Sequence, residues 1–369
     1  MNKSWEYKKI GDVCVVERGG SPRPIDKFIT DDEDGINWIK IGDTSDSMYI
    51  TETAQRIIPE GMKKSRYVKP GDFLLSNSMS FGRPYILKID GCIHDGWLVL
   101  RDEKELFDKR FLYYYLSSKT TYEKFKSMAV GGVVNNLNSE MVRNVSVPVP
   151  SKEEQAEIAD LLDRLKVVLD RRKQELQLLD NLIKARFVEL FKECNNYELL
   201  GDADILISDG NYSSKYPTAD EFVEEGVPFI RASNMVDNTI TDDEMYHISA
   251  EKHAELVKGH VMPYDVLIAT RGAGIGKIAV VPERHNDSNV NAQIVLLRCN
   301  KEKYNPLYLS WYLKLQDTQI KIQGLISGSA QPQLPIKRLV QLELLRPDIE
   351  KQNDFADFVH QVDKSKVVA

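Results

Sequence analysis

The sequence predicts a mixed α/β protein made of two similar domains, each followed by a helix, with an internal repeat of pseudo-twofold character. Short apolar runs bounded by turn residues precede helical periodicity, and this order of motifs occurs twice, about 190 residues apart. Solenoid repeats have periods of about 20 to 50 residues, so this longer period indicates a duplicated domain. We expect domains at 1–150 and 196–347, a central helix at 151–195 and a shorter distal helix at 348–369.

The repeat rests on pairs of motifs that keep their order along the chain. Gly-Asp-Phe-Leu-Leu in the first half corresponds to Tyr-Asp-Val-Leu-Ile in the second, and both contain an aspartate before an apolar run. The corresponding segments are 36–40 with 227–231, 71–75 with 264–268, 81–83 with 274–277, and 148–155 with 345–352.

Each half contains apolar runs typical of strands, followed by a stretch with helical spacing. In the first half the expected strands are 72–75, 85–87 and 97–100, and the helix is 109–125. In the second half the expected strands are 265–268, 278–281 and 294–297, and the helix is 307–315.

The central helix has the clearest pattern in the chain. Ser151 and Glu154 form a capping box, and neither Pro nor Gly occurs from there to Cys194. An apolar residue recurs at a spacing typical of a coiled-coil seam, with Arg172 and Arg186 interrupting it. The predicted seam consists of Leu162, Leu165, Leu169, Leu176, Leu179, Ile183 and Leu190. The alternative is a helix packed on its own domain.

The distal helix is the shorter copy. Asp348 is its expected N-cap, and aligned by the repeat its last residue corresponds to Arg172. We therefore expect the central helix to lack a partner beyond Arg172, which leaves Leu176, Leu179, Ile183 and Leu190 exposed. Such an apolar face would be covered by a second copy of the chain or by another subunit, or would remain bare.

Composition is that of a globular protein, with 42% hydrophobic and 28% charged residues. No apolar run has membrane-spanning length, no signal peptide opens the chain, and the four cysteines form no zinc motif. We expect a reduced cytoplasmic protein with no membrane association. Residues 1–150 contain 22 basic against 21 acidic residues, and 196–347 contain 15 against 20. Neither half is a generally basic nucleic-acid binder.

The sequence contains no recognisable catalytic or metal motif. The segment 271–277 resembles a phosphate loop but begins with Arg and lacks Ser or Thr after Lys277. His247, His253 and His260 are spaced too widely for one helical face, so we expect no metal site. The pair His94-Asp95 has no equivalent at 291–292, which favours a variable recognition position over catalysis.

Together these motifs resemble the specificity subunit of type I restriction-modification enzymes, over essentially the whole chain. The resemblance rests on Val-Pro-Val-Pro-Ser-Lys-Glu-Glu-Gln at 147–155 with Ile-Ala-Asp-Leu-Leu-Asp at 158–163. It also rests on Gly-Gly-Val-Val-Asn-Asn-Leu at 131–137 with its counterpart at 328–334. This chain departs from the family pattern, because family members normally have two full-length helices and its second helix is short.

The resemblance implies a non-catalytic reader of double-stranded DNA. In this family each half is a target recognition domain that reads one part of a split site, and the two helices pair antiparallel as a coiled coil. Two methyltransferase subunits with S-adenosylmethionine would dock on the helices, and a restriction subunit would add ATP- and Mg-dependent cleavage. No cofactor is expected on this chain, and self-dimerisation through the unpaired helix is a further expectation.

Candidate DNA contacts are polar residues near the repeated motifs, because base edges and phosphates favour Arg, Lys, Asn, Gln and Ser. In the first half they are Arg18, Ser21, Arg23, Lys40, Asn77, Ser80 and Arg83, with Lys63, Lys64, Arg66 and Lys69 for phosphates. In the second half they are Arg231, Ser233, Asn234, Thr270, Arg271, Lys277, Asn291 and Gln293. Each has the alternative of being a solvated surface residue.

Three other functions compete with this interpretation. The first is an inactive specificity-subunit remnant that acts only as a DNA-binding or assembly adaptor. The second is a type IIG-like enzyme, which would need methyltransferase and nuclease motifs that the chain lacks. The third is a protein scaffold without a DNA role, which the acidic second half favours.

Overall fold

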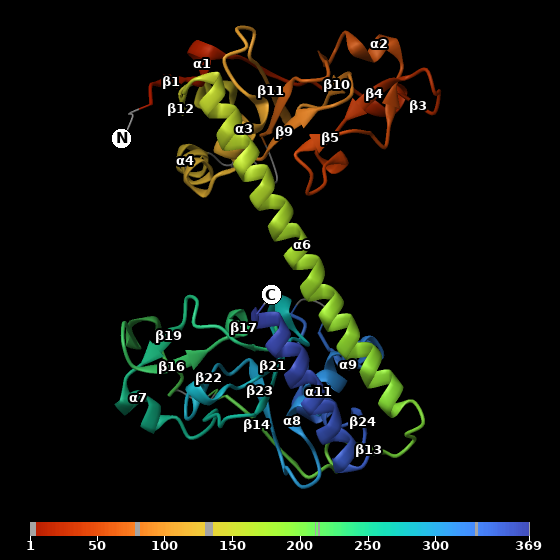
Figure 1. Cartoon of the computed structure of the whole chain (residues 1–369), viewed down its shortest axis with the longest axis vertical. Helices are drawn as coiled ribbons and strands as arrows, with labels where there is room; N and C mark the ends of the chain where they lie inside the picture. Colours follow the sequence, from red (N-terminus) through yellow and green to blue (C-terminus); the bar gives the residue numbers. More distant parts are fainter. Residues whose placement is uncertain are drawn as a thin grey trace. The chain divides into compact units, whose positions relative to one another are not determined.

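The computed structural model describes residues 5–77, 82–129, 136–210, 212, 215–328 and 331–368. It divides into two compact units, Met1–Asp170 and Arg171–Ala369 (Figure 1). The division falls inside the long helix α6 (Lys152–Phe191), so each unit includes one part of that helix.

Unit 1 contains two mixed five-stranded sheets and a two-stranded ribbon, in the orders β2-β11-β8-β9-β5, β3-β6-β4-β10-β7 and β1-β12. Its strands are β1 (Tyr7–Lys9), β2 (Val15–Arg18), β3 (Ile29–Thr30), β4 (Ile36–Ile39), β5 (Tyr49–Ile50), β6 (Arg56–Ile57), β7 (Arg66–Val68), β8 (Phe73–Ser76), β9 (Pro84–Leu87), β10 (Gly91–Ile93), β11 (Trp97–Arg101) and β12 (Ser146–Pro148). Its other helices are α1 (Ile10–Val13), η1 (Ile25–Lys27), η2 (Ile41–Asp43), α2 (Pro59–Met62), α3 (Lys109–Ser117), α4 (Lys119–Ala129) and α5 (Ser139–Arg143).

Unit 2 repeats this plan with the sheets β14-β23-β20-β21, β15-β19-β16-β22, β13-β24 and β17-β18. Its strands are β13 (Tyr197–Leu199), β14 (Ile205–Asp209), β15 (Phe222–Val223), β16 (Val227–Ile230), β17 (Met235–Val236), β18 (Thr239–Ile240), β19 (Tyr246–Ile248), β20 (Val266–Ala269), β21 (Ile278–Val280), β22 (Asn289–Val290), β23 (Ile294–Cys299) and β24 (Glu343–Leu345). Its other helices are η3 (Ala219–Glu221), η4 (Ala232–Asn234), α7 (Ala250–Glu255), η5 (Gly272–Gly274), η6 (Glu283–His285), α8 (Pro306–Lys314), α9 (Gln316–Leu325), α10 (Ile336–Leu339) and α11 (Ile349–Val368).

The two units confirm the predicted duplication of a mixed α/β domain. The order β2-β11-β8-β9 of unit 1 recurs as β14-β23-β20-β21, and the parallel pair β4-β10 recurs as β16-β22. The sequence predicted one helix at 109–125, whereas the structure has α3 and α4 with an extended Ser118 between them. The Ser118 hydroxyl accepts a hydrogen bond from the Thr121 amide (3.3 Å), so it caps α4 and separates the two helices.

The repeated aspartate of the strand motif holds a turn and an arginine. Asp265 is 1% exposed and accepts hydrogen bonds from the Met262 amide and from two nitrogens of Arg298, each at 2.8 Å. Asp72 does the same with the Lys69 amide (3.0 Å) and with Arg101 (3.4 Å). This motif is therefore explained by folding, because a buried carboxylate needs donors and a countercharge.

A buried glutamine fastens each long helix to its own domain. In unit 1, Gln155 accepts a hydrogen bond from the amide of Asp108 (2.7 Å) and donates to the carbonyls of Leu106 and Pro150 (both 3.0 Å). Both Asp108 and its counterpart Asn305 are N-caps, of α3 and α8 respectively. The side chain of Gln155 thus ties α6 to the start of α3.

The same arrangement recurs around Gln352 in unit 2. Its side chain accepts from the Asn305 amide (2.9 Å) and donates to the carbonyls of Lys303 (3.1 Å) and Pro347 (2.8 Å). Both glutamines are 0% exposed. The Glu-Gln and Lys-Gln dipeptides of the sequence repeat therefore mark one interaction made twice.

We predict that Gln352→Leu destabilises unit 2 by about 3 kcal/mol, since it leaves buried backbone groups without partners, each costing about 1–3 kcal/mol. Hydrogen exchange of α11 should rise correspondingly. The matched control is Gln341→Leu at an exposed position, which should change stability by less than about 0.5 kcal/mol. Equal effects of the two substitutions would show that the buried glutamine has no special role.

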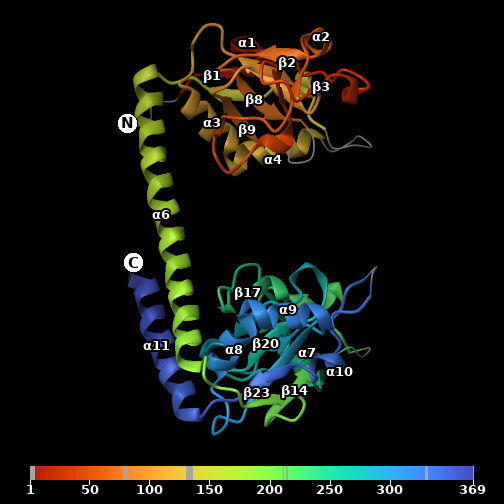
Figure 2. The same cartoon turned by 90° about the vertical axis from the view of Figure 1, so that its right-hand side faces the viewer.

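Helix α11 packs antiparallel against the C-terminal part of α6, within unit 2 (Figure 2). Arg172 donates to the Lys366 carbonyl near one end of the pair, and Phe187 meets Phe355 near the other, with ring centroids 5.1 Å apart. Lys366 also pairs with Asp180 at 2.8 Å. The arginines that interrupt the predicted seam face this partner, since Arg186 lies over the Phe358 ring.

This pairing corrects the expected location of the unpaired part of α6. We expected Leu176, Leu179, Ile183 and Leu190 to be exposed, but Ile183 is 0% exposed and the three leucines are partly buried. Leu179 and Leu190 pack against the unit 2 core. Since the helices run antiparallel, the start of α11 meets the end of α6, whereas the repeat alignment matched start with start. The exposed side chains lie earlier, where Leu165 is 49% and Leu169 is 61% exposed, while Leu162 is partly exposed.

We predict that Ile183→Ala lowers stability by about 3 kcal/mol, because it deletes buried methyl groups from a packed core. Leu169→Ala removes an exposed side chain from the same helix and should cost less than about 1 kcal/mol. Chemical denaturation of both variants checks this. The reverse order of effects would contradict the packing described for α6.

Candidate DNA interface

The ends of β8 and β20 carry equivalent residues from the predicted contact set. The amide of Asn77 donates to the Gly96 carbonyl (2.9 Å), and its carbonyl accepts from the Leu137 amide (3.0 Å). Thr270 makes the same two bonds with Gln293 (2.8 Å) and Leu334 (2.9 Å). Asn77 and Thr270 are thus anchored alike in both units, each bonded to the residue that precedes β11 or β23 and to a leucine that ends the second repeated motif. Ser80 lies outside the described residues.

Four predicted contact residues of unit 1 gather around Asp95. Its carboxylate accepts from Ser21 (3.0 Å) and pairs with Arg23 (3.4 Å). Its backbone carbonyl accepts from the side chains of Arg18 (3.1 Å) and Asn77 (2.9 Å). Asp95 was absent from the predicted contacts, and only its pairing with His94 in the sequence pointed to it.

The charges around Asp95 keep its carboxylate ionised. Burial acts to raise the pKa of this carboxyl, but the hydrogen bond from Ser21 and the charges of His94, Arg18 and Arg23 outweigh burial and lower the pKa. His94 Nε2 lies 3.0 Å from the carboxylate. Asp95 therefore orients donors that would otherwise be free to move, which is the usual work of a supporting group beneath a recognition surface.

A cavity of about 490 Å³ opens beside this cluster. Its wall includes the apolar Trp38, Ile25 and Ile29, and its polar lining comes from both the Asp95 cluster and the η2 turn. The polar lining residues are Ser21, Arg23, Asp26, Lys40, Gln55, His94 and Asp95. The Lys40 ammonium donates to the Gln55 side chain at 2.7 Å. Lys40, which follows β4, thus lines the same cavity as Ser21, Arg23 and Asp95.

The basic residues that were predicted to contact phosphates lie on the surface of unit 1, around α2 and β7. Lys63, Lys64, Arg66 and Lys69 are exposed. Arg66 pairs with Glu17 (3.2 Å), and Lys64 lies over the Phe28 ring at 5.3 Å. Arg83 is exposed, lies 4.0 Å from Asp46 and places its guanidinium over the Tyr85 ring at 5.9 Å.

In unit 2, predicted arginines lie over tyrosine rings. The Arg231 guanidinium is 3.5 Å from the centroid of Tyr246 and donates to the Glu244 carbonyl (2.7 Å). Arg271 is exposed and lies 5.1 Å from the centroid of Tyr212. Each of these arginines is thus positioned by a cation–π contact with a tyrosine that the sequence analysis did not select.

The other predicted residues of unit 2 divide by exposure. Ser233, Lys277 and Gln293 are exposed, and Asn291 is partly exposed with its amide donating to the Tyr216 hydroxyl (3.0 Å). Asn234 is 0% exposed and bonds both Arg231 and Asp243 of its own turn. Asn234 is therefore a turn residue in this structure and offers no group to a base.

Three comparisons with known proteins bear on this chain. The model for the type I restriction modification DNA specificity domain matches residues 2–180 and 204–367. The chain belongs to this family. The sequence-based assignment is thereby confirmed, and with it the DNA-recognition role and the absence of a catalytic role that the family carries.

Similar proteins span nearly the whole chain. The MjaVIII specificity subunit of Methanocaldococcus jannaschii is 21% identical over 382 residues, covering 98% of this chain and 86% of the relative. The EcoBI specificity subunit of Escherichia coli is 24% identical over 362 residues, covering 89% and 73%. The crystal structure of a type I system S subunit from M. genitalium has a TM-score of 0.51 and 14% identity, covering 99% of this chain and 91% of that one.

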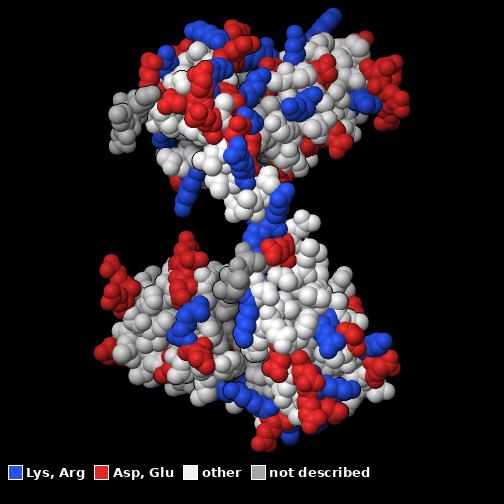
Figure 3. Space-filling view, in the orientation of Figure 1, with Lys and Arg blue, Asp and Glu red and all other residues white. Residues whose placement is uncertain are grey.

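On the face of the protein shown in Figure 3, basic and acidic side chains are interspersed over both units, and neither kind forms a large patch. The net charge of −7 agrees with this mixture. Attraction to a polyanion must therefore come from local groups such as those described above.

Among the described residues, none of the helices combines the length and apolar character that a membrane crossing requires.

We predict that Asp95→Ala weakens discrimination by unit 1 while raising its non-specific affinity for DNA. The substitution releases Ser21 and Arg23 from the carboxylate and removes one negative charge, whereas Arg18 and Asn77 keep their bonds to the backbone carbonyl of residue 95. Asp26→Ala, which removes a negative charge from the same cavity wall, is the control for charge alone. Fluorescence anisotropy with specific and random duplexes over a salt series measures both effects, and unchanged discrimination with Asp95→Ala would contradict the supporting role.

Proposed function

We propose that this chain is the sequence reader of a type I restriction-modification system and that each unit reads one part of a bipartite DNA site. The observation that carries the proposal is one backbone framework with different polar residues at equivalent positions. Asn77 corresponds to Thr270, Lys40 to Arg231, and His94 to Asn291 in their backbone hydrogen bonds. A shared frame with different donors and acceptors is what two readers of different base sequences need.

We divide the candidate DNA contacts into residues suited to base edges and residues suited to phosphates. The exposed and partly exposed polar residues of the predicted set are assigned to base edges, and the exposed basic residues of α2 and β7 to phosphates. Asn77 and Thr270 are left out, because at 1% and 5% exposure their side chains are buried. The base-reading candidates are Arg18, Ser21, Arg23, Lys40 and Arg83 in unit 1 and Arg231, Ser233, Arg271, Lys277, Asn291 and Gln293 in unit 2. The phosphate candidates are Lys63, Lys64, Arg66 and Lys69.

The helices are assigned to assembly. The exposed apolar side chains of α6, among them Leu161, Leu165, Val168 and Leu169, offer a surface to another helix. We infer that a methyltransferase subunit or a second copy of this chain covers it. In the complete assembly two methyltransferase subunits would supply S-adenosylmethionine, and a restriction subunit would supply ATP- and Mg-dependent activity.

The proposal predicts a split methylation motif with fixed spacing when this chain is co-expressed with the methyltransferase subunit encoded beside it. Mapping of methylated bases across the host DNA is the measurement. Arg271→Ala should lower methylation about tenfold or more, because a good base contact contributes about 1–3 kcal/mol of discrimination, and should relax only one part of the motif.

Lys301→Ala is the charge-matched control, because Lys301 follows the opposite end of β23 from Gln293. It should leave the motif unchanged. Relaxation of both parts of the motif by Arg271→Ala, or of neither, would count against one reading unit per part. If a properly assembled complex produced no methylation, the proposal would be wrong.

A further inference from the structure

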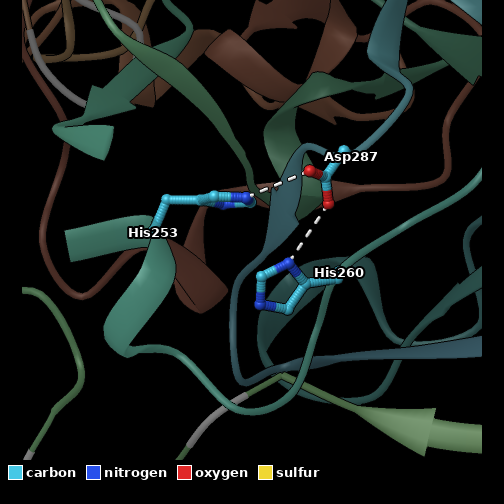
Figure 4. Close-up of side chains that lie close together, drawn as sticks. All are labelled: His253, His260 and Asp287. Atoms are coloured by element: carbon cyan, nitrogen blue, oxygen red, sulfur yellow. Dashed lines mark hydrogen bonds and ion pairs between the residues drawn. The ribbon is translucent and has the colours of Figure 1, made fainter. Parts of the chain in front are cut away.

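A group of two histidines and one aspartate lies in unit 2, away from the residues assigned to DNA. His253 is on α7, His260 is in the segment that follows this helix, and Asp287 precedes β22 (Figure 4). One ligand atom from each of the three residues lies within 4.8 Å of the others. No other such group of His, Cys, Asp and Glu occurs among the described residues.

The hydrogen bonds of His260 fix which of its nitrogens carries the proton. Nε2 lies 2.6 Å from the Leu256 carbonyl oxygen, which can only accept, so Nε2 is the protonated nitrogen. In the neutral ring Nδ1 then has a free lone pair, and it faces Asp287 Oδ1 at 3.2 Å. Two acceptors facing one another at this distance need a cation between them or a second proton on the ring.

His253 repeats this arrangement. Its Nδ1 contacts Asn289 Oδ1, so that Nε2, at 3.4 Å from Asp287 Oδ2, is the free nitrogen. Asn289 is 0% exposed. Metal-bound histidines characteristically donate the other ring N–H to a carbonyl or carboxylate, which orients the ring and makes it a stronger ligand. Both rings here have such an acceptor behind them.

The backbone around the group is held in place. Asp287 donates its amide to the Val261 carbonyl, and Val261 donates to the Ser288 carbonyl, both at 2.9 Å. His260 and Asn289 face one another in a β-bridge. The Ser249 hydroxyl caps α7 by accepting from the Lys252 amide at 3.1 Å. Only small side-chain movements would therefore be needed to bring the three ligand atoms to metal distance.

We propose that His253 Nε2, His260 Nδ1 and an oxygen of Asp287 bind a zinc ion. Zn²⁺ takes imidazole and carboxylate ligands at about 2.0–2.2 Å, which at tetrahedral angles puts ligand atoms about 3.4 Å apart. The distances from His260 Nδ1 to Asp287 Oδ1 (3.2 Å) and from His253 Nε2 to Asp287 Oδ2 (3.4 Å) are close to this value. Because they reach different oxygens, a rotation of the carboxylate would bring one oxygen to both nitrogens, and the three ligand atoms already lie within 4.8 Å of one another. The fourth position faces solvent, since the Asp287 side chain is 67% exposed, and water fills it.

The ion would join α7 to the segment that leads into β22. β22 pairs in parallel with β16, and Asn291 and Gln293 follow it directly. Zinc would thus stabilise the second sheet of unit 2 without contacting DNA. The inference is independent of the proposed function, because it concerns metal content and stability alone.

Elemental analysis of the untagged full-length chain tests the site, after removal of metal by a chelator, reloading with zinc chloride and dialysis. We expect one zinc per chain, and a visible ligand-field spectrum when cobalt replaces zinc. Asp287→Ala should lower zinc affinity at least tenfold, as should His260→Ala. Because Asp287 is exposed, its variant tests the site even if His260→Ala does not fold.

His247→Ala is the matched control, since His247 lies on β19 of the same sheet and outside the group. It should retain one zinc per chain. Zinc should raise the melting temperature of the wild-type and His247→Ala proteins but leave that of Asp287→Ala unchanged. Wild-type protein that holds no zinc, or an Asp287→Ala variant that binds it equally well, would show that the three residues form only a hydrogen-bonded group.

Discussion

The constraint on which the rest of the structure depends is the attachment of each long helix to its own domain by one buried glutamine. Gln155 and Gln352 each accept from the amide of the N-cap residue of a neighbouring helix and donate to two backbone carbonyl groups. A polar side chain with no exposed surface is favourable only when all of its bonds are made. The direction in which α6 and α11 leave their domains is therefore set by specific hydrogen bonds, in addition to apolar packing.

The need for such hydrogen bonds also explains which motifs occur in both copies of the repeat. Asp72 and Asp265 fasten turns, and the glutamines fasten helices, so these residue types recur because the fold requires them. The positions that differ between the units, such as His94 against Asn291, have equivalent backbone bonds and different side chains. Residues that hold the fold thus recur in both units, whereas the polar residues that we propose to read DNA differ between them.

Much of this fold was accessible from the sequence. Paired motifs revealed the duplication, the capping box located α6, and helical spacing located α3 and α8. The resemblance implied the antiparallel pairing of α6, but the unpaired part was located by aligning the two copies start to start, so Ile183 was assigned to the wrong environment. For the candidate interface, sequence reasoning found residues near turns but could not tell the buried Asn234 from the exposed Ser233 beside it. It also missed Asp95, Tyr212 and Tyr246, because a supporting side chain is recognised by what it touches.

The histidines were judged only by their spacing on one helix, whereas His253 and His260 meet from a helix and a loop.

Because each glutamine bonds to backbone atoms alone, its attachment is indifferent to the identity of the side chains around it. Asp108 and Asn305 supply the donating amide in the two units, and Leu106 and Lys303 supply an accepting carbonyl, so different residues form the same hydrogen bonds. The attachment of α6 and α11 therefore places no requirement on the side chains of the loops that it joins, and these side chains differ between the two units without changing it.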